Sequence, residues 1–282
     1  SRTVQVFIKK HHVHAHAVLT EDPITMSGNA ETDSYDSTEG PYGEPNIDDN
    51  GDIVTNSTAN PAISMSGNAT VSGDANTGAS GVINLTGNAD INGNQAHTAN
   101  EYMPPVIVPN NIASLPSSGP LTLSGNTTLP LSDGNYKYTS ISLSGNSSLI
   151  ISGDVIFYVT GSISNSGNSQ IVMEPDSKVT VYFDGSLSIS GNGILNETLD
   201  PSEFSFLGTD SASSVSLTGN GNFHGTVYAP LANISISGNG ENYGAVTGKN
   251  VTMSGNGNIH YDEQLKNDSP AIGYDPYCWQ EK

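Results

Sequence analysis

The sequence predicts an all-β protein, a right-handed parallel β-helix (β-solenoid) of roughly twelve turns with an asparagine ladder. Three observations predict it: a recurring Ser/Thr-Gly-Asn tripeptide, a spacing near twenty residues, and apolar alternation before each copy. The tripeptide has its glycine at Gly28, Gly67, Gly87, Gly125, Gly145, Gly167, Gly191, Gly219, Gly238 and Gly255. A short phrase repeated at a nearly fixed period is typical of a coil stacked on copies of itself. We expect two degenerate copies, near 46–50 and 106–111, which bring the total to about twelve.

Each copy presents the same order of residue types. Stretches such as Ile63-Ser64-Met65 alternate apolar and polar residues, as in a strand with one face toward a core. The exception is Asn165, a polar residue at a position where the pattern predicts a core side chain. Glycine lets the chain bend, asparagine tolerates a tight corner, and a small residue then follows every copy.

Stacked coils lie about 4.8 Å apart, so equivalent asparagines are expected to bond one another. The expected ladder contains Asn29, Asn68, Asn88, Asn126, Asn146, Asn168, Asn192, Asn220, Asn239 and Asn256. An array of exposed Ser, Thr and Asn that binds a ligand is the alternative interpretation of the repeat.

The chain divides into three segments by composition. Residues 1–20 form a basic, histidine-rich strand or arm with three Lys or Arg, four His and no acid; residues 21–265 form the solenoid; residues 266–282 form a C-terminal cap or tail. The ends of a solenoid need caps because they expose unpaired strand edges. The arm is expected either to fold back along its own solenoid or to add a strand to a neighbouring copy, which would build a filament.

Charge and composition exclude several classes. With 8 basic and 28 acidic side chains the net charge is −20, which repels phosphate backbones, so we expect no nucleic-acid partner. No run of eighteen apolar residues is present, so we expect no membrane span in this chain. No signal peptide is visible, and a leader of an exported protein would have been removed before Ser1. Cys278 is the single cysteine, expected as a free thiol, with an intermolecular disulfide as the alternative.

Two groups of residues could bind metal ions. Asp48, Asn50 and Asp52 surround Gly51 with the oxygen ligands that calcium prefers, and the alternative is a solvated turn. His12, His14 and His16 would share one face of a strand and could bind a transition metal, and the alternative is a polar strand face. No cofactor is required by the sequence, and calcium is the candidate cofactor for the acidic group.

The sequence does not predict an enzyme. It contains no nucleophile elbow, phosphate loop or His-Glu-x-x-His motif, and its few basic residues are isolated from one another. A carbohydrate-binding or carbohydrate-cleaving β-helix is the alternative, and the latter would need clustered carboxylates. An ice-binding face is a third interpretation; it is usually built from flat arrays of Thr, whereas Ser is commoner here.

Several phrases resemble a known family. These are "ETDSYDSTEGPYG" (31–43), "NGDIVTNS" (50–57), "VYAPLANISISGNGENYGAVTGKNVTMSGNGNIHYDEQL" (227–265) and Trp279 near the end. They resemble the β-helical C-terminal regions of PilX-like pilus-assembly proteins. The resemblance implies a non-catalytic structural protein, extracellular or on the cell surface of a Gram-negative bacterium, that acts as a type IV pilus-associated adhesin or forms filaments. It implies self-association or pilus components as partners, and surface glycans as a further candidate. Proteins of that kind begin with a membrane-spanning helix, which this sequence does not contain.

Overall fold

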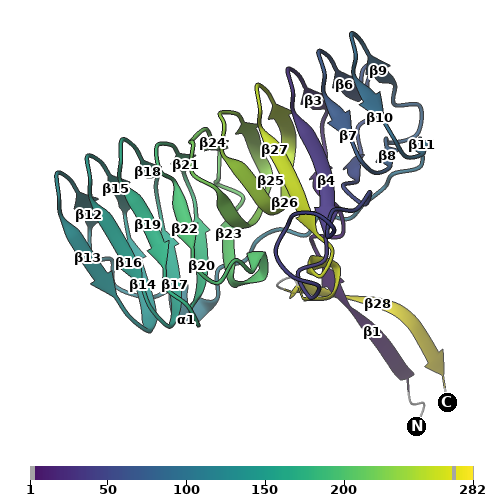
Figure 1. The fold of residues 1–282 in the computed structure, drawn as a ribbon. Helices are drawn as coiled ribbons and strands as arrows, with labels where there is room; N and C mark the ends of the chain where they lie inside the picture. Colours follow the sequence, from purple (N-terminus) through teal and green to yellow (C-terminus); the bar gives the residue numbers. More distant parts are fainter. Residues whose placement is uncertain (1–3, 269–270, 282) are drawn as a thin grey trace.

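The computed structural model describes the backbone of residues 4–268 and 271–281, and the side chains of residues 13–267. These residues form a three-sided β-solenoid of stacked parallel strands (Figure 1), which confirms the predicted parallel β-helix. The described residues make ten coils, not twelve. The two stretches expected to hold degenerate copies, 46–50 and 106–111, contain no strand of the solenoid: the first lies in a loop, and the second lies in the connection that contains α1 (Asn110–Ala113).

The ladder face is the side of the rod that carries the repeated phrase. Its strands, in spatial order, are β12 (Pro120–Leu123), β15 (Ser140–Leu143), β18 (Ile163–Asn165), β21 (Ser186–Ile189), β24 (Ser214–Leu217), the ends of β25 (Phe223–Ile236) and β26 (Glu241–Met253), β3 (Ile24–Met26), β6 (Ile63–Met65) and β9 (Ile83–Leu85). At about 4.8 Å per coil this face is ~43 Å long.

Two further faces complete each coil. The second face contains β13 (Thr128–Leu131), β16 (Ser148–Ile151), β19 (Gln170–Met173), β22 (Ile194–Asn196), the starts of β25 and β26, β27 (Asn258–Asp262), β4 (Glu31–Tyr35), β7 (Thr70–Val71) and β10 (Asp90–Ile91). The third face contains β14 (Gly134–Tyr138), β17 (Asp154–Val159), β20 (Lys178–Phe183), β23 (Phe204–Gly208), the middles of β25 and β26, β2 (Val18–Thr20), β5 (Ile53–Thr55), β8 (Ala75–Asn76) and β11 (Gln95–Ala96).

The chain begins and ends its solenoid in the middle of the rod. β2 pairs with β26 through Val18 and Val246, and β27 pairs with β4, so the first coil stacks on the last. After β11 the chain returns along the outside of the third face, where the hydroxyl of Tyr228 donates to the Pro104 carbonyl at 2.7 Å. It re-enters at β12, at the opposite end (Figure 1). The coil that contains β27 therefore receives its third strand, β2, from the other end of the chain.

The two ends of the chain pair with each other. β1 (Val4–His12) runs antiparallel to β28 (Ala271–Glu281), and this two-stranded arm leaves the rod where the first and last coils meet (Figure 1). Three expectations are therefore corrected. The first segment is divided, because residues 18–20 already belong to the solenoid, which thus begins before residue 21. The segment 266–282 does not cap an end coil, because β28, after the short α2 (Leu265–Asp268), pairs with β1. Within the chain, the arm pairs with the chain's own tail rather than along the solenoid, and strand addition to a neighbouring copy stays a prediction.

The core is a continuous column of inward-facing apolar side chains. Strands such as β17 and β20 alternate buried and half-exposed residues along their length, and Phe157 and Phe183 are at most 2% exposed. The polar exception, Asn165, is 1% exposed but satisfied: its Nδ2 donates to the Gly193 carbonyl at 3.0 Å, and its Oδ1 accepts from the Ser169 hydroxyl at 3.0 Å.

Glycine is required at the repeated corner for two reasons. Gly67 has a φ of +76°, a conformation that L side chains rarely adopt. A Cβ at Gly67 would also lie 2.8 Å from the carbonyl oxygen of Gly28 in the next coil. The small residue two positions later, such as Ala69, is fully buried in the narrow edge of the coil.

Among the described residues, no helix is long and apolar enough to span a membrane.

Candidate functional site

The repeated asparagines lie along one exposed edge of the rod, amide to amide. In one run, Asn146 Nδ2 donates to Asn126 Oδ1 at 2.9 Å, and Asn168 Nδ2 donates to Asn146 Oδ1 at 3.0 Å. A second run joins, in spatial order, Asn220, Asn239, Asn256, Asn29, Asn68 and Asn88, at 2.9–3.3 Å.

The two runs are separated at Asn192. Its Nδ2 reaches only the main-chain oxygen of Asn168, at 3.5 Å. The corner on the other side, at Gly219, lacks the positive φ that the other nine glycines of the repeat have. The altered backbone at Gly219 lies at the step from Asn192 to Asn220, where the amide-to-amide series is also interrupted.

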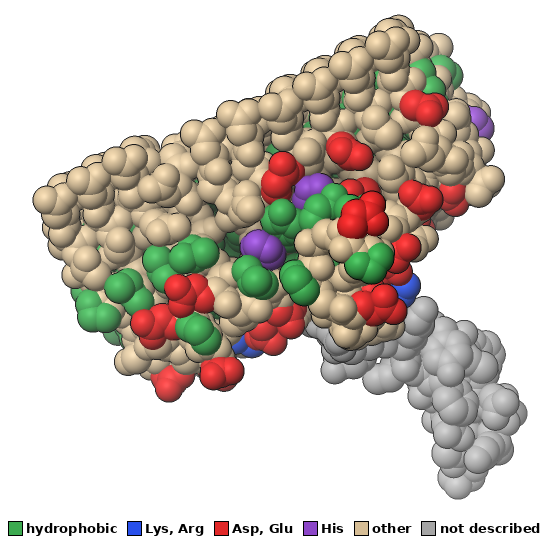
Figure 2. All heavy atoms as spheres, viewed as in Figure 1, with side chains coloured by type: hydrophobic (Ala, Val, Ile, Leu, Met, Phe, Trp, Pro, Cys, Tyr) green, Lys and Arg blue, Asp and Glu red, His purple; other side chains and the backbone are tan. Residues whose placement is uncertain are grey.

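The ladder face is uncharged over its whole length. Ten seven-residue segments build it, each ending at a ladder asparagine, such as 140–146 (SISLSGN) and 250–256 (NVTMSGN). None of the ten contains Asp, Glu, Lys, Arg or His. The upper edge of the rod in Figure 2, where the ladder corners lie, is correspondingly free of charged side chains, while carboxylates gather lower on the same side. This neutrality is a property of the sequence that apolar alternation and corner residues do not reveal, because it becomes visible only when the repeats are aligned.

Outward side chains on the ladder face are small and polar. One column of equivalent positions holds Thr122, Ser142, Ser164, Ser188, Ser216, Ser235, Thr252, Thr25, Ser64 and Asn84, all exposed or half-exposed. Each of these groups can both donate and accept a hydrogen bond. The face is therefore a regular array of neutral hydrogen-bonding groups.

A second feature lies on the second face, in the middle of the rod, where the first and last coils meet. The register places His224, Tyr243, His260 and Asp33 side by side on consecutive strands. The rings of His224 and Tyr243 are stacked, with centroids 4.2 Å apart and planes 6° apart. Tyr42, from the loop after β4, covers the row, with its ring centroid 4.0 Å from that of His260.

Both nitrogens of His260 are engaged by the chain. Its Nδ1 lies 2.5 Å from Asp33 Oδ1, and its Nε2 lies 3.1 Å from Glu241 Oε2. The Tyr42 hydroxyl donates to Asp33 Oδ2 at 2.6 Å. Burial works against charge on the His260 ring, but the hydrogen bonds and charges of Asp33 and Glu241 outweigh it and raise its pKa. Both ring nitrogens are occupied and the residue is 4% exposed, so the cluster joins three successive coils, those of β26, β27 and β4.

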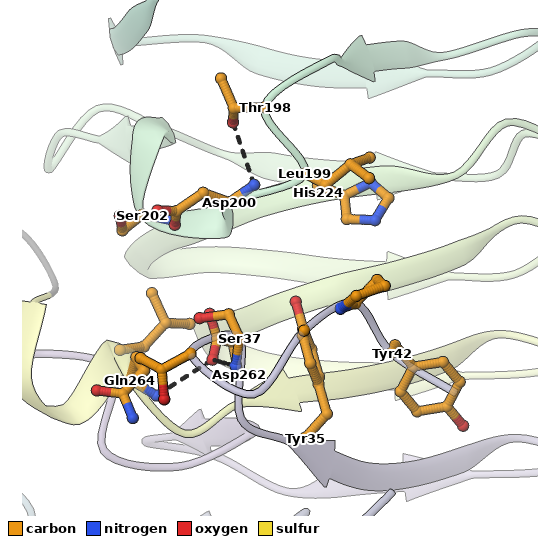
Figure 3. A pocket seen from close by; sticks show the side chains of 14 residues that line it. Tyr35, Ser37, Tyr42, Thr198, Leu199, Asp200, Ser202, His224, Asp262 and Gln264 are labelled. Atoms are coloured by element: carbon orange, nitrogen blue, oxygen red, sulfur yellow. Dashed lines mark hydrogen bonds between the residues drawn. The ribbon is translucent and has the colours of Figure 1, made fainter. Parts of the chain in front are cut away.

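Beside this cluster is a cavity of about 490 Å³ (Figure 3). Two loops form its walls: residues 37–42 after β4, and residues 198–202 around η1 (Pro201–Glu203). Tyr35, His224 and Asp262 reach it from the strands. Burial, and to a smaller extent the charge of His260, lowers the pKa of His224 to about 4, so the ring is neutral near pH 7.

The calcium candidates bond to separate partners. Asn50 Nδ2 donates to Glu263 Oε1 at 2.8 Å, and Asp52 Oδ1 accepts from the Asp74 main-chain N–H at 2.7 Å. Asp48 is exposed, and its main chain pairs with Ser34. Calcium binding at these residues stays a prediction.

The expected histidine face does not form. β1 ends at His12, whose side chain lies outside the described residues, and residues 13–17 are not in a strand. His14 is 1% exposed, with neither ring nitrogen hydrogen-bonded, while His16 Nδ1 lies 3.9 Å from Asp52 Oδ2. Across the part of the chain with described side chains, no three His, Cys, Asp or Glu are placed to hold a metal ion. Cys278 also lies outside that part.

Comparison with known proteins gives one family. No curated protein sequence matches the chain. Among solved structures, the chain is similar to the crystal structure of an ice-binding protein from the Antarctic ascomycete Antarctomyces psychrotrophicus, at 15% identity and a TM-score of 0.33, with 88% of this chain and 94% of that chain covered. The model of DUF7305, described as a domain of unknown function, matches residues 87–268, which is more than half of the 282 residues. This chain belongs to the DUF7305 family.

Proposed function

We propose that this protein is a non-catalytic adhesive rod of the cell surface, and that its ladder face binds neutral polysaccharide. The observation that carries the proposal is the absence of any charged residue from all ten segments of that face, in a chain of net charge −20. Charged groups repel or select ligands by their own charge, whereas a neutral array of donors and acceptors matches the hydroxyls of a neutral sugar polymer.

The regularity of the face supports a long, repeating partner. Donors and acceptors recur every ~4.8 Å along a length of ~43 Å, so many weak contacts can act together. A single contact of this kind is weak because water competes for each group. Binding would therefore depend on the array rather than on one residue.

The resemblance of residues 227–265 to PilX-like proteins supports a place beside a type IV pilus, on the surface of a Gram-negative bacterium. Pilus components and surface glycans are then the partners of the proposal. The occupied nitrogens of His260 favour binding over cleavage, because the most prominent buried acid–base cluster is held by its own partners.

The test places positive charges on the ladder face. Thr122, Ser235 and Thr25 are exposed and lie on three different coils, so each can be replaced by Lys without entering the core. The purified chain is expected to sediment with cellulose or chitin particles, and the triple variant is expected to bind about tenfold more weakly or worse. Negatively charged alginate beads should capture neither the unchanged chain nor the triple variant.

The matched control adds the same charge elsewhere. Thr128, Leu195 and Gln95 are exposed on the strands β13, β22 and β11 of the other two faces. Their triple Lys variant should bind the particles as the unchanged chain does. If both triple variants lost particle binding equally, or if the unchanged chain sedimented with neither cellulose nor chitin, the proposal would be overturned.

Ice is a second candidate for the same face, because a regular array of neutral hydrogen-bonding groups also matches a crystal of water. Thermal hysteresis of the unchanged chain, lost in the ladder-face variant and kept in the control, would identify ice as the ligand. That result together with no polysaccharide binding would replace the first candidate by the second.

A further inference from the structure

The cavity on the second face is a separate feature from the ladder face. Its volume of about 490 Å³ is in the range of small-molecule sites, and its walls come from segments far apart in the sequence. In Figure 3, Thr198, Asp200 and His224 lie on one side of the opening, and Tyr35 and Asp262 lie on the other. Because the cavity lies on another face of the rod, what it binds can be tested independently of polysaccharide binding.

A buried hydroxyl without a partner points into this cavity. Tyr35 is 1% exposed, and its hydroxyl oxygen has no hydrogen-bond partner in the chain. Burial raises the pKa of this phenol, so it is neutral and can both donate and accept. In Figure 3 its oxygen points toward the gap between the two sides. Buried polar groups are nearly always paired, so a bound ligand would supply what the chain does not.

Two carboxylates line the cavity. Asp200 Oδ1 accepts from the Ser202 main-chain N–H at 2.8 Å, and Asp262 Oδ1 accepts from the main-chain N–H groups of Ser37 and Gln264 at 3.1 and 3.2 Å. These bonds fix both carboxylates in place through one oxygen each. Burial, followed by the charge of Asp200, raises the pKa of Asp262, as expected where negative charge lacks a counter-ion.

The described residues that line the cavity include no Lys or Arg to neutralise these carboxylates. They do include the aromatic rings of Tyr35 and Tyr42, and the hydroxyl or amide groups of Ser37, Thr198 and Gln264. Carboxylates and aromatic faces both attract an organic cation, and hydroxyl and amide groups pair with ligand hydroxyls.

We propose that the cavity binds an amino sugar. Its ammonium group lies against Asp200 and Asp262 and pairs with the free hydroxyl of Tyr35. Its ring packs against Tyr42, and its hydroxyls bond to the polar side chains of the two loops. A metal ion alone is a poorer match, because the described residues contain no group of three acidic, His or Cys side chains arranged for one, and the cavity is far larger than an ion.

The test compares three sugars that differ at one position. Isothermal titration calorimetry at pH 7 should detect binding of glucosamine, which carries the ammonium. Binding of N-acetylglucosamine, in which the nitrogen is neutral, and of glucose, which has a hydroxyl there, should be weaker by about tenfold or more. Equal binding of the three sugars, or no binding of glucosamine at millimolar concentration, would overturn the proposal.

Two conservative variants locate the site. Asp200→Asn keeps the oxygen that accepts from Ser202 and removes the charge, so glucosamine binding should fall by about tenfold. Tyr35→Phe keeps the ring and removes the hydroxyl, and should weaken binding severalfold. Asp210→Asn removes an exposed carboxylate that does not line the cavity and should leave binding unchanged. Thermal unfolding of each variant shows that the fold is kept; unchanged glucosamine binding in folded Asp200→Asn would refute the assignment.

Discussion

Replacing His14 by Leu should stabilise the protein and remove part of its sensitivity to acid. His14 is 1% exposed, and neither of its ring nitrogens has a hydrogen-bond partner. Its ring meets Tyr228 edge to face, with centroids 6.1 Å apart, between the incoming N-terminal segment and the third face. At pH 7.5 the neutral ring leaves two buried polar atoms unpaired, so the free energy of unfolding should rise by about 1–2 kcal/mol in His14→Leu.

The larger effect is the dependence on pH. Burial lowers the pKa of His14 from 6.5 to about 3, so the unfolded chain takes up a proton well before the folded chain does. Stability from this residue is therefore present above pH 6.5 and is lost as the pH falls toward 3. The loss approaches about 1.4 kcal/mol for each pH unit below 6.5, and because the unfolded ring is already half protonated at pH 6.5, it amounts to about 2.3 kcal/mol between pH 6.5 and 4.5.

Urea unfolding followed by circular dichroism measures this directly, at pH 7.5, 6.5, 5.5 and 4.5. Other titrating groups are common to both proteins, so the difference between His14→Leu and the unchanged chain isolates His14. That difference should grow by about 2.3 kcal/mol from pH 6.5 to 4.5. A constant difference for His14→Leu across this range would refute the reasoning.

Three further changes test the ladder, the corner and the central cluster by thermal unfolding. Asn146→Leu removes exposed amide bonds on both sides, which water can replace, so it should cost only about 0.5–1 kcal/mol; a loss several times larger would contradict an exposed ladder. Gly67→Ala should cost more than Gly125→Ala, because both have positive φ but only Gly67 faces backbone of the next coil; equal costs would mean that backbone strain alone matters. Asp33→Asn should lower the melting temperature more at pH 5.5 than at pH 9. Because the pKa of His260 is raised in the folded chain, the protonated ring stabilises the fold fully below pH 6.5, and this stabilisation is lost as the pH rises through the folded-state pKa. An equal loss of melting temperature at both pH values would contradict this reasoning.

The sequence predicted the coil well because a coil is a local object. Alternation around Ile63–Met65, a glycine corner at Gly67 and a buried Ala69 all follow from neighbouring residues, and the structure shows each of them. The number of coils was overestimated for the same reason. Residues 46–50 and 106–111 lie at distances along the chain that fit the period, but spacing does not show whether a segment pairs with a coil.

The candidate sites were harder to predict. The neutral ladder face was in the sequence, as ten segments without a charge, and aligning the repeats would have found it. The cavity was not, because Tyr35, Asp200 and Asp262 belong to different coils, brought together by strand pairing. The histidines at 12, 14 and 16 suggested a shared strand face, but β1 ends at His12, and burial at the join of the coils decides the environment of His14.

By itself, the sequence determined the repeating unit: its strands, its corner, the positions of the ladder asparagines and the uncharged face, because each depends on residues a few positions apart. The tertiary structure alone decided the order of the coils. The first coil stacks on the last, so β2 completes the coil of β27, and the arm of β1 and β28 leaves from the middle of the rod. Nearly identical coils can pair in many orders through the same main-chain hydrogen bonds. The order is therefore set by contacts between particular distant side chains, such as Asp33 with His260, and not by the repeat itself.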